Sequence, residues 1–589
     1  MLVGRSIKTG LVGGIASLFV AMTGLLAKVA GINLIGTQVT GARVILLLSP
    51  FVAAYVAVRP RVVAGQIEEA TTSSAARSGA LAGVAAGGLV AAASVFTDWY
   101  GVDRVGEIFI PVNSALLEII AFGKSMIVGA LILTMGGAIV GAAGGAFRTI
   151  APALRRPIGT AIGVTLLAGL LQRIVPIALI QLGIKATWLY SPATGGLTWL
   201  GAFLVLAGSL GFSWLWARRG KDARDTIRTI VREQPSARIV VVLVGIGVLA
   251  TIPLLLGAVI SEVLGTVMVF MLLGLGLNIV VGYAGLLDLG YVAFFGFGAY
   301  AMALLTGGTL NTTTGSAAPA FGMDLNFYIA IPIVVLLAAF VGVLIGGPVL
   351  RLRGDYLAIV TLGLGEMVTI LISSNWFKPL VGGPQGMRNI TDAKLAGFSF
   401  RDPQHFFYLA LAFVLLAAFV SWRLANSRIG RAWNAMREDE QVADAMGIST
   451  TRFKLLAFAT GGAVGSVGGA LFAVKIGSLT PSSFEIIVSI TALAIVVLGG
   501  MGSIPGVVVG ALVLIGLPGL LREFEEFRQL IYGAALVSIM VLRPQGLVPN
   551  VRRSRELQED DVTQDKWAGD LAAEAEVAAS ISPVGEGSG

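Results

Sequence analysis

The 589-residue sequence contains no cysteine and only one histidine, His405. Without cysteine the chain has no disulfides, thiolate metal ligands or cysteine nucleophiles. A single histidine excludes two-histidine metal motifs and argues against a histidine-based triad. Charged residues are also scarce, at 13% of the chain compared with about 25% in soluble domains. So few polar side chains cannot cover a water-facing surface, so we expect a chain that lies mostly in lipid. With the missing cysteines and the single histidine, we also expect no catalytic residues and no metal site.

Apolar residues, by contrast, make up 56% of the sequence. A helix that crosses the ~30 Å hydrocarbon core of a bilayer needs about 20 mostly apolar residues. About sixteen segments satisfy this requirement, six within residues 1–217 and ten within residues 239–550. The predicted fold class is therefore all-α, a polytopic integral membrane protein with about sixteen transmembrane helices.

The distribution of charge predicts the orientation and the domains. Lys and Arg concentrate in alternate loops, which by the positive-inside rule places these loops and both termini in the cytoplasm. Residues 1–217 are then an N-terminal membrane extension, 218–238 a basic cytoplasmic linker, 239–550 the main membrane domain and 551–589 an acidic, disordered cytoplasmic tail. The linker either lies along the anionic leaflet or is solvated. Because the basic residues fall in short loops between apolar runs, we expect the lipid bilayer, and no nucleic acid, as their partner.

Polar and glycine residues interrupt one apolar segment of the main domain. Asn278 and Asp288 lie there, with Gly282 and Gly285 between them. Non-helical backbone at membrane depth is tolerated only inside protein or beside a water-filled cavity. We therefore predict a broken or re-entrant helix over 282–290 and treat these four residues as candidates for the translocation pathway. The alternative is two ordinary helices joined by a tight cytoplasmic turn.

Ionisable residues inside predicted spans are informative, because each costs about 2.5–3.5 kcal/mol to insert. Glu366 lies mid-span beside glycines that leave room for a ligand or a neighbouring helix. It is a further candidate for the translocation pathway, or it forms a structural hydrogen bond between helices. Glu262 and Glu485 lie near the outer ends of spans, and we expect them to reach the interface by snorkelling.

Glycine is abundant, with 78 residues in the chain. Small residues let helices approach closely in lipid, where association depends on packing contacts more than on the hydrophobic effect. The segments Gly129–Gly145 and Gly461–Gly469 are therefore predicted to be helix-packing faces.

The sequence contains no recognisable site that would supply the energy for transport. A phosphate-binding loop requires a glycine, four residues and then Gly-Lys-Ser/Thr. Gly123-Lys124-Ser125 comes closest, but Glu118 occupies the position of the first glycine and the segment opens a predicted span. The spans also lack the concentrated carboxylate and histidine relays of proton-coupled carriers. We expect no cofactor in this chain, and a hydrolysing partner on the cytoplasmic side fits better than a built-in energy source.

The cytoplasmic loop 425–454 contains a predicted amphipathic helix. Its acidic residues 438–440 suit a helix start, where the dipole favours negative charge, and Gly447 suits a helix end. This helix fits either the groove of a partner protein or the membrane interface. The residues that share its apolar face at helical spacing are Ile429, Ala432, Trp433 and Met436.

Six motifs then follow one another between residues 240 and 550. They are Gly276-Leu277-Asn278 through Gly285 with Phe294–Tyr300; Arg353-Gly354-Asp355-Tyr356 through Gly365-Glu366; Gly382-Gly383-Pro384-Gln385-Gly386; Arg428-Ile429-Gly430-Arg431 through Ala443 to Gly447-Ile448; Gly499-Gly500-Met501-Gly502-Ser503-Ile504-Pro505-Gly506; and Arg543-Pro544-Gln545-Gly546-Leu547. With these motifs the stretch resembles the permease subunit of branched-chain amino-acid ABC importers, the LivM-type family. Six ordered motifs are far more specific than one glycine pattern.

The resemblance implies a function. Residues 239–550 would be the permease domain of an ATP-binding-cassette importer in the cytoplasmic (inner) membrane, where it translocates branched-chain or related amino acids. The chain itself would not be an enzyme, because a separate cytoplasmic ABC ATPase subunit would hydrolyse ATP and dock on the 425–454 loop. The coupling residues implied for this loop are Trp433, Arg437, Glu438, Asp439, Glu440, Ala443, Gly447 and Ile448.

The resemblance also implies partners outside the cytoplasm and within the membrane. An extracytoplasmic substrate-binding protein would deliver the substrate to the outer face, where 375–405 is the largest loop of the domain. A second, related permease subunit would complete the pore. The outer-loop residues in question are Gly382, Gly383, Gln385 and Gly386.

Two features depart from the family pattern. Leu286, Asp288 and Tyr291 stand where members more often have glutamine, serine and histidine, which weakens any transfer of substrate identity. Residues 1–235 have no counterpart in the core family, and we expect them to form a helical packing layer or scaffold. The alternatives are a urea or short-amide ABC permease, a self-powered secondary transporter, and a channel or membrane scaffold.

Overall fold

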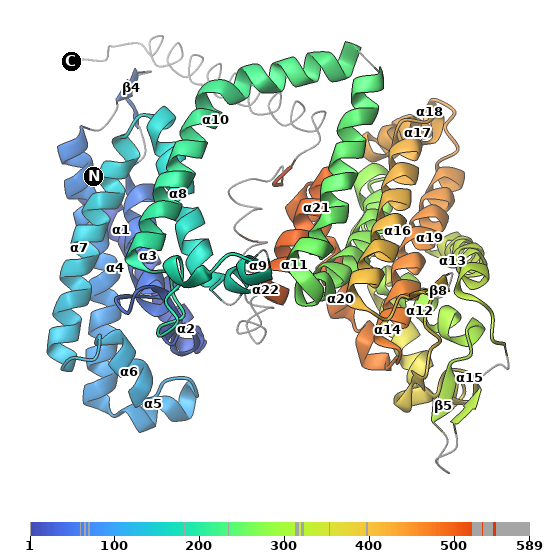
Figure 1. Cartoon of the computed structure of the whole chain (residues 1–589), viewed down its shortest axis with the longest axis horizontal. Helices are drawn as coiled ribbons and strands as arrows, with labels where there is room; N and C mark the ends of the chain where they lie inside the picture. The colour runs from blue at the N-terminus through green and yellow to red at the C-terminus, as the bar shows by residue number, and fades with distance from the viewer. Residues whose placement is uncertain are drawn as a thin grey trace, which may run out of the picture. The chain divides into compact units, whose positions relative to one another are not determined.

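The computed structural model is a helical protein with a few short strands (Figure 1). The described residues form two compact units, one up to Leu256 and one from Gly257 to Leu520. The division falls within α11 (Pro235–Leu277), where Gly257 leaves the helical backbone with a φ of +73°. The structure describes residues 2–58, 61–63, 66–68, 71–172, 174–181, 183–233, 235–311, 317–319, 323–352, 354–395, 398–520, 533, 537 and 546–548.

The first unit is almost entirely helical. Its helices are α1 (Leu2–Met22), α2 (Leu25–Ala30), α3 (Gly41–Ala57), α4 (Thr72–Tyr100), α5 (Val102–Ile108), α6 (Ser114–Ile120), α7 (Met126–Thr149), α8 (Pro152–Leu170), α9 (Val175–Gln181), the 3₁₀-helix η1 (Ala186–Trp188) and α10 (Trp199–Glu233). Its strands form two antiparallel pairs, β1 (Asn33–Ile35) with β2 (Val39–Thr40) and β3 (Arg61–Val63) with β4 (Gln66–Glu68). Residues 218–233 of the predicted basic linker continue α10 as helix; their place in the cytoplasm stays a prediction.

Helices α4 and α7 of this unit pack through glycines. A Cβ atom at Gly83 would lie 1.9 Å from the carbonyl oxygen of Gly137, and one at Gly141 would lie 2.4 Å from the carbonyl oxygen of Gly79. Only a hydrogen atom fits at such distances, so the two backbones touch directly. The prediction that Gly129–Gly145 is a packing face is confirmed.

The second unit begins with the second part of α11. The elements that follow are the π-helix η2 (Asn278–Tyr283), α12 (Val292–Leu305), β5 (Thr309–Asn311), β6 (Ala317–Pro319), α13 (Phe327–Val349), α14 (Asp355–Ser373), α15 (Lys378–Val381), the 3₁₀-helix η3 (Gly383–Gln385), β7 (Met387–Arg388), β8 (Lys394–Leu395), β9 (Phe398–Ser399), α16 (Pro403–Ala425), α17 (Arg428–Glu438), α18 (Glu440–Ala445), α19 (Thr450–Ile476), the 3₁₀-helix η4 (Pro481–Phe484), α20 (Ile486–Gly499), α21 (Ile504–Ala511), the π-helix η5 (Leu512–Gly516) and α22 (Leu517–Leu520). Strand β5 pairs with β6 and β7 in an antiparallel three-stranded sheet, and β8 pairs with β9.

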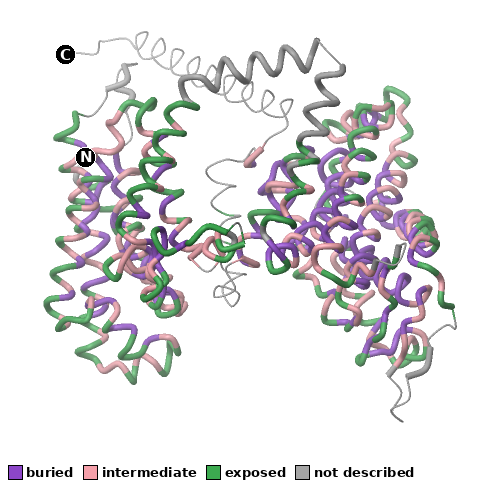
Figure 2. Tube along the Cα trace, viewed as in Figure 1, coloured by how far each residue is buried: buried purple, intermediate pink, exposed green. Residues whose placement is uncertain are grey.

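Helix α19 lies in the core of this unit and packs against α12 and α13. A Cβ atom at Gly469 would lie 1.9 Å from the carbonyl oxygen of Phe295, and one at Gly298 would lie 2.1 Å from that of Ser466. The prediction that Gly461–Gly469 is a packing face is thereby confirmed. Figure 2 shows buried residues concentrated among these helices, and the largest fully buried side chains here include Trp433, Tyr291, Phe294, Phe295, Phe407, Phe458 and Phe484.

The described residues include nine helices that are long and apolar enough to cross a membrane, or ten if α8 and α9 form one bent span. Shorter apolar helices occur at Gly41–Ala57, Val292–Leu305 and Ile504–Leu520. The all-α, polytopic membrane class is therefore confirmed, whereas the number of sixteen spans is not. The predicted tail at 551–589 lies outside the described residues.

Candidate functional site

The predicted break in the apolar segment is present at the end of the span Gly257–Tyr283. The α-helix passes into the π-helix η2, the backbone then leaves helical geometry, and α12 begins at Val292. A π-helix inside an α-helical span is rare and often marks a functional position. The interruption predicted over 282–290 is therefore confirmed as a break, while its re-entrant form and its depth in the bilayer stay predictions.

Polar side chains hold this break from inside the unit. Asn278 is fully buried, and its Oδ1 accepts a 2.8 Å hydrogen bond from the backbone N–H of Gly502. Asp288 is 2% exposed, and its Oδ1 accepts a 2.9 Å hydrogen bond from the N–H of Gly290. The Tyr291 hydroxyl donates to the carbonyl of Gly461 on α19. Of these three bonds, the one from Gly290 pairs a backbone group of the break itself, and the other two join side chains of this region to the backbone of Gly502 and of Gly461.

Two buried polar atoms of the break have no hydrogen-bond partner among the described residues. They are Nδ2 of Asn278 and Oδ2 of Asp288. Unpaired buried polar groups cost free energy and are rare in folded proteins. Both atoms belong to residues that the sequence predicts for the translocation pathway.

The loop after α16 forms two short helices where we expected one. Ser427 begins α17, and its Oγ accepts the N–H of Ile429 at 3.1 Å. Asp439 separates the helices and begins α18, where its Oδ1 accepts the N–H of Gln441 at 2.8 Å. Acidic residues thus stand at a helix start as predicted. Gly447 then ends α18 in the left-handed region, with a φ of +85°.

The apolar face of α17 is buried against the chain itself. Trp433 is fully buried, and its Nε1 donates a 2.8 Å hydrogen bond to the carbonyl of Phe453; Ala432 and Met436 are buried beside it. This face is therefore covered within the chain, while the docking of the loop on a partner or on the membrane interface stays a prediction. Two apolar side chains are strongly exposed at α18, Val442 (58%) within the helix and Met446 (79%) directly after its last residue.

Arg437 connects this loop to the broken span. Its Nη1 donates a 2.8 Å hydrogen bond to the carbonyl oxygen of Gly282. Its aliphatic stem packs on Gly285, where a Cβ atom would lie 2.5 Å from Cγ of Arg437. The structure therefore joins Arg437, a candidate for coupling, to Gly282 and Gly285, which are candidates for the translocation pathway. No local pattern in the sequence indicated this contact.

A second link runs from α18 to α19. Lys454 donates a 2.7 Å hydrogen bond to Oε1 of Glu440, and the lysine side chain is only 5% exposed. Lys454 was not predicted as a site residue, because a lysine at the start of a span is explained by the positive-inside rule, which sets the orientation of the span in the membrane. A buried lysine without its carboxylate would be strongly destabilising, so this pair fixes α18 on the start of α19.

Glu366 is half-buried on α14, and no hydrogen bond or ion pair joins its side chain to another described residue. The structural hydrogen bond that we considered for it is thus not formed within the described part of this chain. Its neighbour Gly365 packs on the broken segment, since a Cβ atom there would lie 3.1 Å from Cα of Gly290. Glu366 therefore lies on a helix that contacts the break, one residue away from the contact.

The outer-loop candidates lie at the opposite end of the second unit from α17 and α18, next to α15 (Figure 1). Gly382, Gly383 and Gly386 all have positive φ and form a tight turn around η3. A Cβ atom at Gly386 would lie 1.8 Å from the carbonyl oxygen of Leu479, so this turn is fixed against the chain that follows α19. Gln385 is exposed on it.

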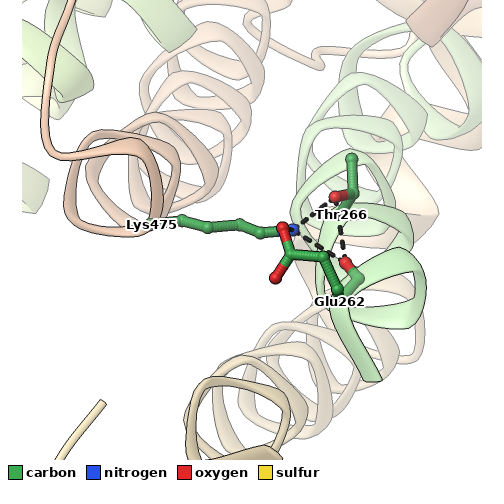
Figure 3. A network of polar contacts seen from close by, with 3 residues as sticks. All are labelled: Glu262, Thr266 and Lys475. Carbon is green, nitrogen blue, oxygen red and sulfur yellow. Dashed lines mark hydrogen bonds and ion pairs between the residues drawn. The ribbon is translucent and has the colours of Figure 1, made fainter. Parts of the chain in front are cut away.

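A polar network that the sequence did not predict joins α19 to α11 (Figure 3). Nζ of Lys475 lies 3.1 Å from Oε1 of Glu262 and 2.8 Å from the Glu262 carbonyl oxygen, and it also donates to Oγ1 of Thr266. Glu262 was expected only to snorkel, but it is an ion-pair partner. Lys475 is 213 positions away from Glu262 in the chain, so the spacing of residues in the sequence could not indicate that the two side chains pair.

Comparison with known proteins places these features in a family. A family model described as "Branched-chain amino acid transport system / permease component" matches residues 259–540. The high-affinity branched-chain amino acid transport system permease protein LivM of Escherichia coli (strain K12) is 43% identical over 314 residues, which cover 49% of this chain and 70% of that protein. The chain belongs to this permease family. The family match begins two residues after the second unit does, and every candidate site residue lies inside it.

Other relatives of this permease carry different names. The autoinducer 2 import system permease protein LsrC of Escherichia coli (strain K12 / DH10B) is 26% identical over 264 residues, covering 42% of this chain and 74% of that protein. The branched-chain amino acid permease LivH of Escherichia coli (strain K12) is 32% identical over 140 residues, covering 23% and 44%. No solved structure matches the chain. The chain is thus a multi-pass membrane permease component, and residues 1–256 lie outside the family match.

Proposed function

We propose that this permease is the membrane subunit of an ABC importer for branched-chain or related amino acids, and that separate ATPase subunits drive it. The LivM relatives support this amino-acid class, and the lack of a phosphate-binding loop in the sequence supports an external motor. In the orientation that we propose, both termini and the α17–α18 loop face the cytoplasm of an inner membrane. ATP and Mg²⁺ are then bound by the ATPase.

The observation that carries this proposal is the hydrogen bond from Arg437 to Gly282. It joins the cytoplasmic loop to the last turn of a span at the point where the helix is broken. An ATPase that closes on ATP would press on Val442 of α18 and on Met446 directly after it, and the packed pair α17–α18 would move with it. Arg437 would transfer this movement to η2. The partner can shift the permease between inward- and outward-open states only through such differential contacts.

Two further partners complete the proposed importer. An extracytoplasmic substrate-binding protein would contact the outer turn at Gln385, which the close contact of Gly386 with the Leu479 carbonyl oxygen fixes against the chain. A second, related permease subunit would pair with the second unit. The similarity of the chain to LivH as well as to LivM supports a partner of the same family.

The direct test is reconstitution in proteoliposomes with ATP supplied on the ATPase side. We expect radiolabelled leucine to accumulate only when the ATPase, the second permease and the binding protein accompany this chain. Competition with unlabelled isoleucine, urea and acetamide separates the amino-acid importer from a short-amide permease. Uphill uptake by this chain alone would show a secondary transporter and overturn the proposal.

Replacing Gly447 with valine is expected to reduce ATP-driven uptake about fivefold while ATP hydrolysis continues. A side chain at a φ of +85° costs ~1–2 kcal/mol, so the end of α18 would shift or fray beside the proposed docking residues. Uptake and hydrolysis are measured in the same proteoliposomes. Gly447→Asn is the matched control, because asparagine tolerates this backbone region and nothing lies within 4 Å of a Cβ there. Unchanged uptake by the valine variant contradicts the docking role.

Replacing Glu366 with glutamine is expected to change uptake about fivefold without changing assembly. A charge beside a partly hydrated route contributes on the order of 1 kcal/mol to the binding of a zwitterion, and glutamine keeps the shape of the side chain. The measurement is the concentration dependence of leucine uptake, with subunit co-purification as the assembly control. Identical kinetics for both forms would remove Glu366 from the translocation pathway.

A further inference from the structure

The second unit contains a cavity of about 530 Å³ between α12, α13, α14 and α15. Ligand sites in proteins commonly have about this volume. Its lining runs along one face of α12 from Ala293 to Leu305, a rise of ~18 Å at 1.5 Å per residue. The cavity is therefore long, and it lies beside the break and the outer turn without including any residue predicted for the pathway.

The lining of the cavity excludes a free amino acid. Apart from Tyr300, every described residue that lines it is a glycine or has an apolar side chain. A zwitterion placed there would lose the hydration of two charges and gain no partner, which is strongly unfavourable. The ligand that fits is a long hydrocarbon chain.

Tyr300 supplies the one polar group. Its side chain is 4% exposed, and its hydroxyl has no hydrogen-bond partner among the described residues. The ring is held at 5.4 Å from that of Phe484. Tyr300 stands five residues before the end of α12. In the orientation proposed above this is the outer end of the helix, which would place the hydroxyl near the level of the lipid ester groups. A buried hydroxyl without a partner is unfavourable, so an acceptor on the ligand would complete it.

The cavity is open on the side of α13 and α14. Its lining residues there, Leu337 and Leu371, are 41% and 42% exposed and adjoin outward-facing Leu336 and Ile370, which are 71% and 65% exposed. In a chain that spans a membrane, such exposed apolar helix faces contact hydrocarbon. A molecule that enters the cavity by this route comes from the bilayer.

We propose that this cavity binds one acyl chain of a membrane phospholipid, whose ester carbonyl accepts a hydrogen bond from the Tyr300 hydroxyl. The chain lies along α12 toward Ala293 and separates α12 from the outer parts of α13 and α14. This lipid site is distinct from the proposed transport route, and its existence does not depend on the identity of the transported substrate.

The test is photo-crosslinking of the full-length protein in vesicles of phosphatidylethanolamine and phosphatidylglycerol that contain a phosphatidylethanolamine with a diazirine in its acyl chain. We expect adducts on peptides that contain Phe297, Leu337 and Leu371. Ala301→Trp, which fills the cavity, should reduce these adducts about tenfold. Tyr300→Phe, which keeps the volume, should reduce them about fivefold, the factor expected for one hydrogen bond.

Leu344→Trp is the matched control for the cavity-filling variant, because Leu344 is 63% exposed on α13 and does not line the cavity; it should leave the adducts unchanged. The proposal is overturned if adducts spread evenly over the exposed helix faces, or if Ala301→Trp labels as strongly as the parent. Labelling of the same peptides by a diazirine analogue of leucine, with no lipid adduct, would also overturn it and assign the cavity to the amino acid.

Discussion

Arg437→Met is expected to lower ATP-driven leucine uptake about tenfold or more while the chain remains assembled with its partners, because a charge-assisted hydrogen bond to a buried carbonyl is worth ~1.5–3 kcal/mol. Methionine keeps much of the apolar stem that packs on Gly285 but cannot donate to the carbonyl oxygen of Gly282. The loop helices would then move without moving η2. The measurement is the number of leucine molecules taken up per ATP hydrolysed in reconstituted vesicles.

Arg431→Met is the control for this variant. Arg431 lies on the same helix and is exposed, and no hydrogen bond or ion pair joins its side chain to another described residue. We expect its uptake per ATP to match that of the parent chain. If Arg437→Met also matches the parent, the contact with Gly282 has no part in coupling. If Arg437→Met loses co-purification with the ATPase, the arginine acts in docking and not in transfer of movement.

Gly83→Val is expected to have the largest effect on the fold, separating α4 from α7 and destabilising the first unit by about 3 kcal/mol. The Cβ atom at this position would lie 1.9 Å from the Gly137 carbonyl oxygen, which is backbone and has no rotamer to change. The measurement is thermal unfolding of the purified protein together with the rate of limited proteolysis between α4 and α7. We expect faster proteolytic cleavage within residues 1–256 and an unchanged rate of cleavage in the second unit.

Gly88→Val on the same helix is the matched control, since the nearest atom to its Cβ would lie 4.0 Å away. It should unfold like the parent. Equal stability of Gly83→Val and Gly88→Val would show that the direct backbone contact does not hold these helices together. Leucine uptake by Gly83→Val then reports on the role of the first unit: retained uptake supports the predicted scaffold, and lost uptake indicates that the permease domain needs it.

The break in the second unit was predictable because its signal is local. Asn278 and Asp288 among glycines are unfavourable in a continuous apolar helix, whatever the rest of the chain does. What surrounds them was not predictable. The hydrogen bond from Gly502 to Asn278 joins residues 224 positions apart, and nothing in the sequence near Asn278 points to that glycine beyond its place in a separate motif.

In the loop 425–454, too, the local features were predictable and the tertiary contacts were not. Its helical spacing, acidic helix start and terminal glycine were read correctly, since each depends on neighbouring residues. Periodicity shows that Trp433 and Met436 share a face with one another, but it does not show what covers the face. In the structure the covering comes from the chain itself, so the surface left for a partner is on α18.

The sequence by itself determined that this protein lies in a membrane, where most of its helices run and where one of them breaks, because the cost of placing polar groups in hydrocarbon acts residue by residue. Its permease family followed separately, from the resemblance of its ordered motifs to those of known permeases. Only the tertiary structure decided that Arg437 bonds to the broken span across 155 positions, that Glu262 pairs with Lys475, and that α12 to α15 leave a cavity lined mostly by apolar side chains. These features depend on which helix faces meet. That choice is made by packing over the whole chain, and many sequences with the same apolar pattern would make it differently.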